Sequence, residues 1–221
     1  PAVVKALALT GLSLLMLGNA RATSSLKTLH NFCNVGECED GLFPMAKLVR
    51  DSDGNYFGAT QSGAFTTDNG TIFELERRGA KYKFRTIYTF CEDDETCPEQ
   101  PGNLILGADG SIYGTTVIGG RNLGGTVFKL MPNANRKKWK LVTLYSFCAK
   151  EDCKDGQSIS GGLTYQGQEQ GIPYDGTSPL YGTSYYGGEK NGGTVYKLTF
   201  KPGKHVAIHT IIHDFCFAQG C

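Results

Sequence analysis

Clustered carboxylates and a glycine-rich loop are the features of this sequence that could do chemistry. Glu92-Asp93-Asp94-Glu95 and Glu151-Asp152 are runs of acids, and paired carboxyl groups are what glycoside hydrolases use. The segment Gly119-Gly120-Arg121-Asn122-Leu123-Gly124-Gly125 could present backbone N–H groups to a phosphate. No Lys-Ser or Lys-Thr follows these glycines and no helix is predicted after them, so we exclude a P-loop.

Cysteines are a further source of chemistry, and all 8 fall in close pairs. Zinc sites favour two residues between paired cysteines, and redox sites favour Cys-x-x-Cys, whereas here four or five residues intervene. We therefore predict local structural disulfides, with metal binding as the alternative, and we expect no metal and no other cofactor. The predicted pairs are Cys33/Cys38, Cys91/Cys97, Cys148/Cys153 and Cys216/Cys221.

One acidic segment is similar to a calcium-binding loop. Asp51-Ser52-Asp53-Gly54-Asn55 has the D-x-D-G-N pattern, but Ser62 stands where a calcium loop needs its final Glu. The corresponding segment of the next repeat, Gly107-Ala108-Asp109-Gly110, lacks the pattern. We predict a turn.

Three internal repeats must position these groups. Gly70-Thr71-Ile72-Phe73-Glu74-Leu75 recurs with conservative changes at 125–130 and 193–198. A block centred on Tyr/Phe-Gly-Ala/Thr precedes each copy, at 56–60, 112–116 and 180–184, and a block ending in Phe-Cys follows, at 87–91, 144–148 and 212–216. Leu29-His30-Asn31-Phe32-Cys33 is a lone extra copy of the last block.

Each repeat reads as four short antiparallel strands. In the first repeat we predict strands at 45–50, 55–60, 71–76 and 83–90, because these segments are rich in β-branched and aromatic residues. Asp53-Gly54, Asp109-Gly110 and Asp175-Gly176 predict two-residue type I′ hairpin turns between the first and second strands. Four strands per repeat are typical of a β-propeller blade, so the glycine-rich loop is the connection between the second and third strands.

The recurring pattern D-G-x-x-Y-G-T-T…G-G-x-x-x-G-G-T-V-F-K-L…L-Y-S-F-C resembles the GloVer-type tandem repeat of secreted bacterial proteins, over residues 26–221. The resemblance implies an exported, propeller-like repeat domain. It brings no catalytic residues that could be carried over to this chain. The third repeat departs from the pattern by an insertion of about ten residues at 165–173.

The N-terminus and the composition bear on location and partners. Lys5, the apolar run 6–17 and Ala20-Arg21-Ala22 predict a secretory signal peptide over 1–22, too short to span a membrane. A net charge of +1 with 19% charged residues gives no reason to expect nucleic acid as a partner. We expect a secreted chain, extracellular, periplasmic or at the cell surface, with no membrane span after signal removal.

We thus predict an all-β, propeller-type repeat domain over 23–221, with three four-stranded blades at 39–91, 97–148 and 153–216 and one extra N-terminal strand at 26–33. Closed propellers have at least four blades. We therefore expect either missing blades, with the chain a fragment, or self-association that closes the ring.

The loops on one rim of the blades are the candidate ligand surface. We predict a binding scaffold that recognises a glycan or protein at the cell surface, and no catalytic residues. A polysaccharide hydrolase or lyase is the first alternative and a purely structural repeat the second. The candidate rim residues are Phe65, Asp68, Arg121, Asn122, Tyr185, Tyr186, Glu189 and Lys190.

Overall fold

The computed structural model describes residues 25–34, 36, 38–63, 70–90, 97–201 and 206–216. The predicted signal peptide, the rim residues Phe65 and Asp68, and the cysteines Cys91 and Cys221 lie outside the described residues. Two three-residue 3-10 turns, Glu151–Cys153 and Gln168–Gln170, are the helices of the described part, and neither is long enough to cross a membrane.

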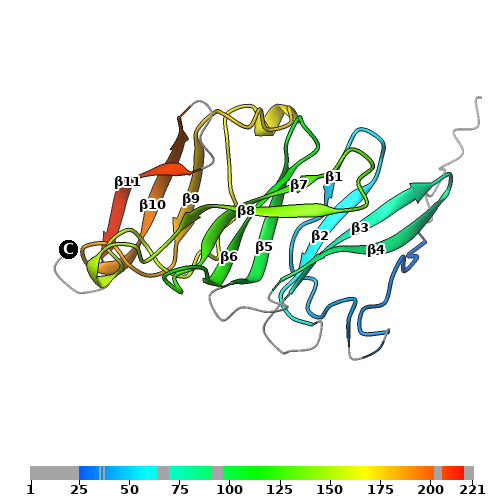
Figure 1. Ribbon diagram of the computed structural model, residues 1–221, viewed down its shortest axis with the longest axis horizontal. Helices are drawn as coiled ribbons and strands as arrows, with labels where there is room; N and C mark the ends of the chain where they lie inside the picture. The colour runs from blue at the N-terminus through cyan, green and yellow to red at the C-terminus, as the bar shows by residue number, and fades with distance from the viewer. Residues whose placement is uncertain are drawn as a thin grey trace, which may run out of the picture.

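Three antiparallel sheets stand side by side in an open, propeller-like arrangement (Figure 1). In sheets 1 and 2 the strands follow chain order, β1 to β4 and β5 to β8, and sheet 3 has the order β11-β10-β9. The strands are β1 (Val49–Arg50), β2 (Tyr56–Thr60), β3 (Thr71–Arg78), β4 (Lys81–Thr89), β5 (Pro98–Leu106), β6 (Ile112–Gly119), β7 (Thr126–Pro132), β8 (Trp139–Ser146), β9 (Leu180–Ser184), β10 (Asn191–Phe200) and β11 (Ala207–Cys216). The predicted all-β fold and its four-stranded repeat unit are confirmed.

The turn type predicted for the Asp-Gly pairs is wrong, although the hairpins of the first two repeats are where we expected them. Only the glycine of each pair has a positive φ, +87° at Gly54 and +77° at Gly110. The Gly107 N–H donates to the Ser111 carbonyl across a three-residue loop, which is the type I turn with a bulge rather than the type I′ turn. The Asp109 carboxylate accepts the Ser111 N–H at 3.0 Å and holds this geometry.

The third repeat lacks its predicted first strand. An isolated bridge between Thr164 and Tyr181 is the pairing that remains next to β9. Ser158 has a φ of +55° and Gly161-Gly162 follow, and neither feature favours a continuous strand. The insertion then begins at Tyr165, so sheet 3 has three strands instead of four.

The extra strand predicted at 26–33 is also absent, because residues 25–34 join no ladder. Because the segment copies the block that ends the fourth strand of a repeat, it would have to pair with the free edge of a third strand. Each of β3, β7 and β10 already pairs with β4, β8 or β11 on that side. The N-terminal segment packs its side chains on sheet 1 instead, with the Phe32 ring 5.1 Å from that of Phe73.

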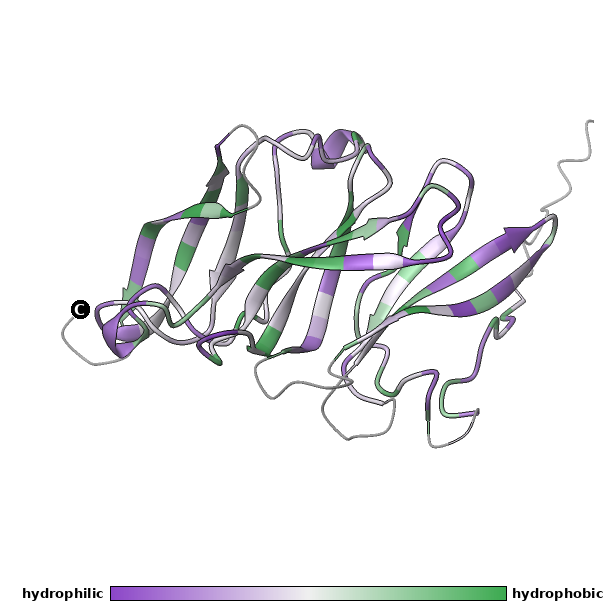
Figure 2. Ribbon diagram, in the orientation of Figure 1, coloured by the Kyte–Doolittle hydropathy of each residue, from purple (hydrophilic) through white to green (hydrophobic). Residues whose placement is uncertain are grey.

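Two cores lie between neighbouring sheets. Between sheets 1 and 2, Phe57 and Ile72 pack with Ile112 and Phe128. The next residues along sheet 2, including Tyr113 and Val127, face the second core with Leu180, Tyr196 and Leu198 of sheet 3. Successive side chains of a strand point to opposite faces, so sheet 2 serves both cores, and Figure 2 shows hydrophobic residues along the strands of all three sheets.

A glycine in the second strand of each repeat accommodates an aromatic ring from the third strand. Gly58 pairs across the sheet with Phe73, and a Cβ atom on Gly58 would collide with the Phe73 ring. Gly114 with Phe128 and Gly182 with Tyr196 repeat the arrangement. This contact explains why a glycine and an aromatic recur together in the sequence.

The loop at Cys148–Cys153 lies between sheets 2 and 3, and the loop at Cys33–Cys38 precedes sheet 1. The predicted disulfides Cys33–Cys38 and Cys148–Cys153 are present. Cys97 and Cys216 are also disulfide-bonded, and the cysteines predicted to pair with them lie outside the described residues.

A buried aspartate two residues after the second cysteine organises each loop whose two cysteines are both described. Asp155 is fully buried and accepts the Tyr145 hydroxyl at 2.7 Å and the Ala149 and Lys150 N–H groups at 3.1 Å. Asp40 accepts the His30 Nε2–H at 2.8 Å and the Cys33 N–H at 2.9 Å. These aspartates hold each loop to the block that precedes it, which has the pattern aromatic-x-Phe-Cys in both cases (residues 30–33 and 145–148).

His209 lies in the packing between sheets 2 and 3. Its ring stacks on Tyr145 at 4.8 Å and meets the edge of Phe147 at 5.6 Å. Neither ring nitrogen has a hydrogen-bond partner among the described residues. Burial lowers the pKa of His209 to about 4, Asp155 opposes this decrease, and Lys150 adds to it.

We expect Asp155→Asn to lower the free energy of unfolding by about 1–3 kcal/mol, because an amide cannot accept all three hydrogen bonds and leaves buried donors unpaired. Denaturant unfolding of the full chain measures the change. Asp152→Asn, an exposed acid of the same loop, is the matched control and should stay within about 0.5 kcal/mol of wild type. Equal losses in the two variants would contradict the proposed role of Asp155.

We also expect acid to weaken the packing around His209. A histidine with a folded pKa below its unfolded value of about 6.5 stabilises the fold fully above that value, and the contribution is lost as the pH falls toward 4. His209→Phe keeps an aromatic ring and should show a smaller loss of stability between pH 7 and pH 4.5 in denaturant unfolding. An identical loss in both proteins would contradict the lowered pKa of His209, because a histidine that titrates alike in the folded and unfolded states adds no pH dependence to stability.

Candidate functional site

An inner groove runs between β1, β5 and the segment at 162–173 that precedes β9. Two adjoining cavities of about 570 and about 640 Å³ form it, and they share walls that include Lys47, Val49, Leu104 and Gln168. The full lining comprises residues 47–53, 103–108, 110, 136, 162–165, 168, 169 and 171–173. All three repeats therefore contribute to one site.

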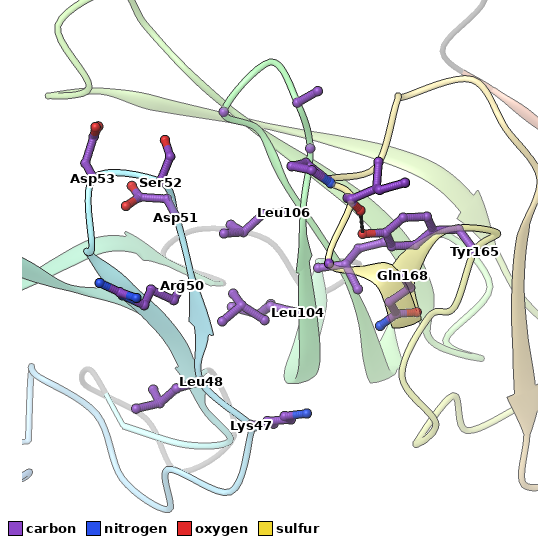
Figure 3. A pocket seen from close by; sticks show the side chains of 18 of the residues that line it. Lys47, Leu48, Arg50, Asp51, Ser52, Asp53, Leu104, Leu106, Tyr165 and Gln168 are labelled. Atoms are coloured by element: carbon purple, nitrogen blue, oxygen red, sulfur yellow. Dashed lines mark hydrogen bonds between the residues drawn. The ribbon is translucent and has the colours of Figure 1, made fainter.

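Apolar side chains of β5 make the floor of the groove. Leu104 and Leu106 alternate along β5 and extend toward β1 (Figure 3). Lys47 and Leu48 stand on the β1 side, both exposed. The groove can thus bury apolar groups of a ligand in its centre and contact polar groups of the ligand at its margins.

The insertion of the third repeat forms the opposite wall. Its backbone is fixed to the end of β5, because the Tyr174 N–H donates to Leu106 O at 2.9 Å and the Ala108 N–H donates to Tyr174 O at 2.8 Å. The Tyr165 hydroxyl donates to Ile172 O at 2.7 Å and closes the inserted loop on itself. Burial raises the pKa of Tyr165, so its hydroxyl remains a donor at neutral pH.

A charged cluster closes the groove near the β1–β2 turn. Arg136, from the turn between β7 and β8, donates to the Asp51 carboxylate at 3.2 Å and lies 4.0 Å from Glu74. Arg85 pairs with Glu74 and donates to Arg136 O at 3.0 Å. Glu74 is almost completely buried, and a buried carboxylate needs such partners to offset its lost hydration.

The calcium-like segment is a turn, as predicted. Gly54 donates its N–H to Asp51 O at 3.1 Å, and the Asp51 carboxylate accepts the backbone and side-chain N–H groups of Asn55 at 2.9 Å each. Asp51 is therefore occupied by Asn55 and Arg136. Searching the described residues for groups of three or more His, Cys, Asp or Glu side chains that could hold a metal ion finds none.

The predicted rim residues that the structure describes lie on the side of the cysteine loops. Gln157 and Tyr186 exchange two backbone hydrogen bonds, which joins the 148–158 loop to the loop between β9 and β10. Tyr185 and Tyr186 are 61% and 41% exposed, and their rings meet edge to face at 4.6 Å.

The charged and amide residues of the rim are less free than the tyrosines. Glu189 pairs with Lys154 at 3.2 Å, and the Asn122 side chain donates to Ser146 O at 3.4 Å. Arg121 and Lys190 are exposed. The rim residues remain predicted ligand contacts, and those that the structure describes line neither cavity of the inner groove.

The glycine-rich loop uses its N–H groups within the protein. The Gly120 N–H donates to Cys97 O at 3.0 Å, and the Gly188 N–H of the third repeat donates to Cys153 O at 3.3 Å. Gly119 has a φ of +79°, and a Cβ atom there would collide with Cys97 O. Close approach of the cysteine loop, rather than an anion, therefore requires the glycines.

Sequence reasoning missed the inner groove. The one available signal was the insertion at 165–173, which supplies a wall of the groove.

Comparison with known proteins supports the repeat assignment. The profile of the Gloeobacter/Verrucomicrobia repeat matches residues 19–178. No curated protein matched the chain. The matched region covers most of the sequence and contains the first two repeats together with the start of the third. This repeat protein therefore belongs to the Gloeobacter/Verrucomicrobia repeat family, as its motifs predicted.

Proposed function

We propose that the chain is an exported binding scaffold that holds an extended polypeptide segment of another protein in the inner groove. The observation that carries the proposal is that two sheet edges border the groove. β1 and β5 are the terminal strands of sheets 1 and 2, and an edge strand offers backbone N–H and C=O groups to an added strand.

The chain itself already uses one of these edges. Tyr174, directly after the insertion, forms a parallel bridge with Gly107, directly after β5. A ligand strand would extend this pairing into the open part of the groove. Its alternate side chains would meet Leu104 and Leu106 on the floor and the polar groups of Lys47 and Gln168 at the margins.

Export is supported by the cysteine chemistry. Disulfides persist in oxidising compartments and are rare in the cytosol, and Cys33–Cys38 and Cys148–Cys153 are both bonded. The signal-like sequence over 1–22 agrees with this location. An extracellular or periplasmic partner follows from the proposal.

The rim offers a second candidate function, glycan binding. Sugars stack on exposed aromatic rings, and Tyr185 and Tyr186 present two such rings side by side. Hydrolysis of a bound polysaccharide is the enzymatic form of this alternative.

Selection of random linear peptides on phage against the full chain tests the proposal, followed by fluorescence polarisation with an enriched peptide. Ile172, 57% exposed, lines the groove, and Leu123, 59% exposed, lies on the rim loop. We expect Ile172→Asp to weaken the peptide Kd by about tenfold, since it places a charge against an apolar ligand surface. Leu123→Asp, the matched control, should leave the Kd unchanged.

Two results would overturn the groove as a polypeptide site. Loss of peptide binding in Leu123→Asp and Tyr185→Ala, but not in Ile172→Asp, would assign the ligand to the rim. Failure to enrich any peptide, together with co-sedimentation of the chain with insoluble polysaccharide, would favour glycan binding. Release of reducing ends in the same tubes would favour the hydrolase.

A further inference from the structure

One contact recurs at each junction between sheets. The phenylalanine that ends the outer strand of one sheet packs against an aromatic ring in the third strand of the next sheet. Phe90 lies 5.5 Å from Phe128, and Phe147 lies 4.9 Å from Tyr196, measured between ring centroids. Both phenylalanines are fully buried.

The N-terminal segment makes the same contact on the outer face of sheet 1. Phe32 lies 5.1 Å from Phe73, the position equivalent to Phe128 and Tyr196. His30 stacks on Phe84 at 3.6 Å, as Tyr145 stacks on His209 at 4.8 Å one junction later. Residues 30–33 therefore occupy on sheet 1 the place that the preceding sheet's aromatic-x-Phe-Cys block occupies elsewhere.

The last copy of the block, His213-Asp214-Phe215-Cys216, has no following sheet among the described residues. Phe215 is 45% exposed, whereas Phe90 and Phe147 are fully buried. Ile212 is 54% exposed, whereas Leu144, its equivalent in the second repeat, is 3% exposed. The open face of sheet 3 thus presents to solvent the positions that form a core between sheets 1 and 2 and between sheets 2 and 3.

The sequence of this last block matches the N-terminal segment. His30-Asn31-Phe32-Cys33 and His213-Asp214-Phe215-Cys216 share the pattern His-x-Phe-Cys, whereas the first and second repeats have tyrosine in place of the histidine. Phe73 and Phe84 on sheet 1 already receive a histidine and a phenylalanine with this spacing. The outer face of sheet 1 therefore accommodates a histidine and a phenylalanine with the same spacing that the end of sheet 3 presents.

We propose that sheet 3 of one copy docks on sheet 1 of a second copy, with His213 and Phe215 replacing His30 and Phe32 against Phe84 and Phe73. The interface continues the sheet-to-sheet packing already present twice in each chain. Two copies would supply six sheets, within the range of about four to eight found in closed propellers. A head-to-tail contact of this kind closes into a ring when its rotation allows.

In this arrangement residues 30–33 act as a built-in competitor. The segment joins no strand ladder, and it is held by ring contacts, the disulfide and the bonds to Asp40. Weakening the segment should therefore promote association. Damaging the open face of sheet 3 should prevent it.

Sedimentation velocity of the full chain over a range of concentrations tests the proposal. We expect reversible association of the wild type, and Phe32→Ala should tighten the association Kd by about tenfold because it weakens the competitor. Phe215→Asp and Ile212→Asp should each weaken the Kd by about tenfold or more. Leu123→Asp, an equally exposed apolar residue away from this face, should behave as wild type.

Both face residues are exposed in the single chain, so the variants should fold, and far-ultraviolet circular dichroism and the unfolding midpoint verify this. Wild type and Phe32→Ala that both remain monomeric at the highest concentrations would overturn the proposal. Association that Phe215→Asp and Ile212→Asp leave intact would also overturn it. Either result would show that a second copy of the chain does not cover the open face.

Discussion

The burial of one phenylalanine at each junction between sheets, directly after β4 and directly after β8, is the interaction on which the architecture depends. Phe32, Phe90 and Phe147 each pack against an aromatic ring of the following sheet. Full burial of such a side chain stabilises the fold by about 1.5–3 kcal/mol, and the ring pair adds about 0.5–1.5 kcal/mol. Because the cysteine follows directly, the chain must turn at this point toward the next first strand. Sheets that follow one another in the chain therefore also pack against one another, and the hydrophobic face of each sheet is buried by its neighbour.

The inner groove is a consequence of the same constraint. Packing through the cores fixes sheets 1 and 2 face to face and leaves their terminal strands, β1 and β5, bordering the space between them. Arg136 then connects the far end of sheet 2 to Asp51 and Glu74 of sheet 1, which holds the spacing of the two sheets beside the groove. The insertion adds a wall and also joins the second core: the backbone at Tyr174 bonds to the end of β5, and the rings of Tyr165 and Tyr174 are buried in the cluster that contains Tyr113.

The repeat and its strands could be predicted from the sequence because their causes are local. Gly58 and Phe73 recur as a motif since the ring needs the space that the glycine leaves, and the strand order follows from short hairpins. Features set by contacts across the fold were not predictable in this way. The loss of the third repeat's first strand depends on the backbone at Ser158. The groove depends on three segments distant in sequence. The loop aspartates, Asp40 and Asp155, could have been found from their constant position two residues after the second cysteine.

Tyr145 shows how loop closure and sheet packing are coupled. Its hydroxyl donates to Asp155 inside the cysteine loop, while its ring stacks on His209 of the next sheet. A carboxylate that orients the hydroxyl thus also fixes the ring, so the loop sets the geometry of the junction as well as the path of the chain. His30 repeats both contacts on sheet 1, with Asp40 and with Phe84. The N-terminal segment therefore makes all the contacts that the end of a preceding sheet makes at a junction, although it belongs to no sheet. These contacts explain why it can cover sheet 1 without forming a strand.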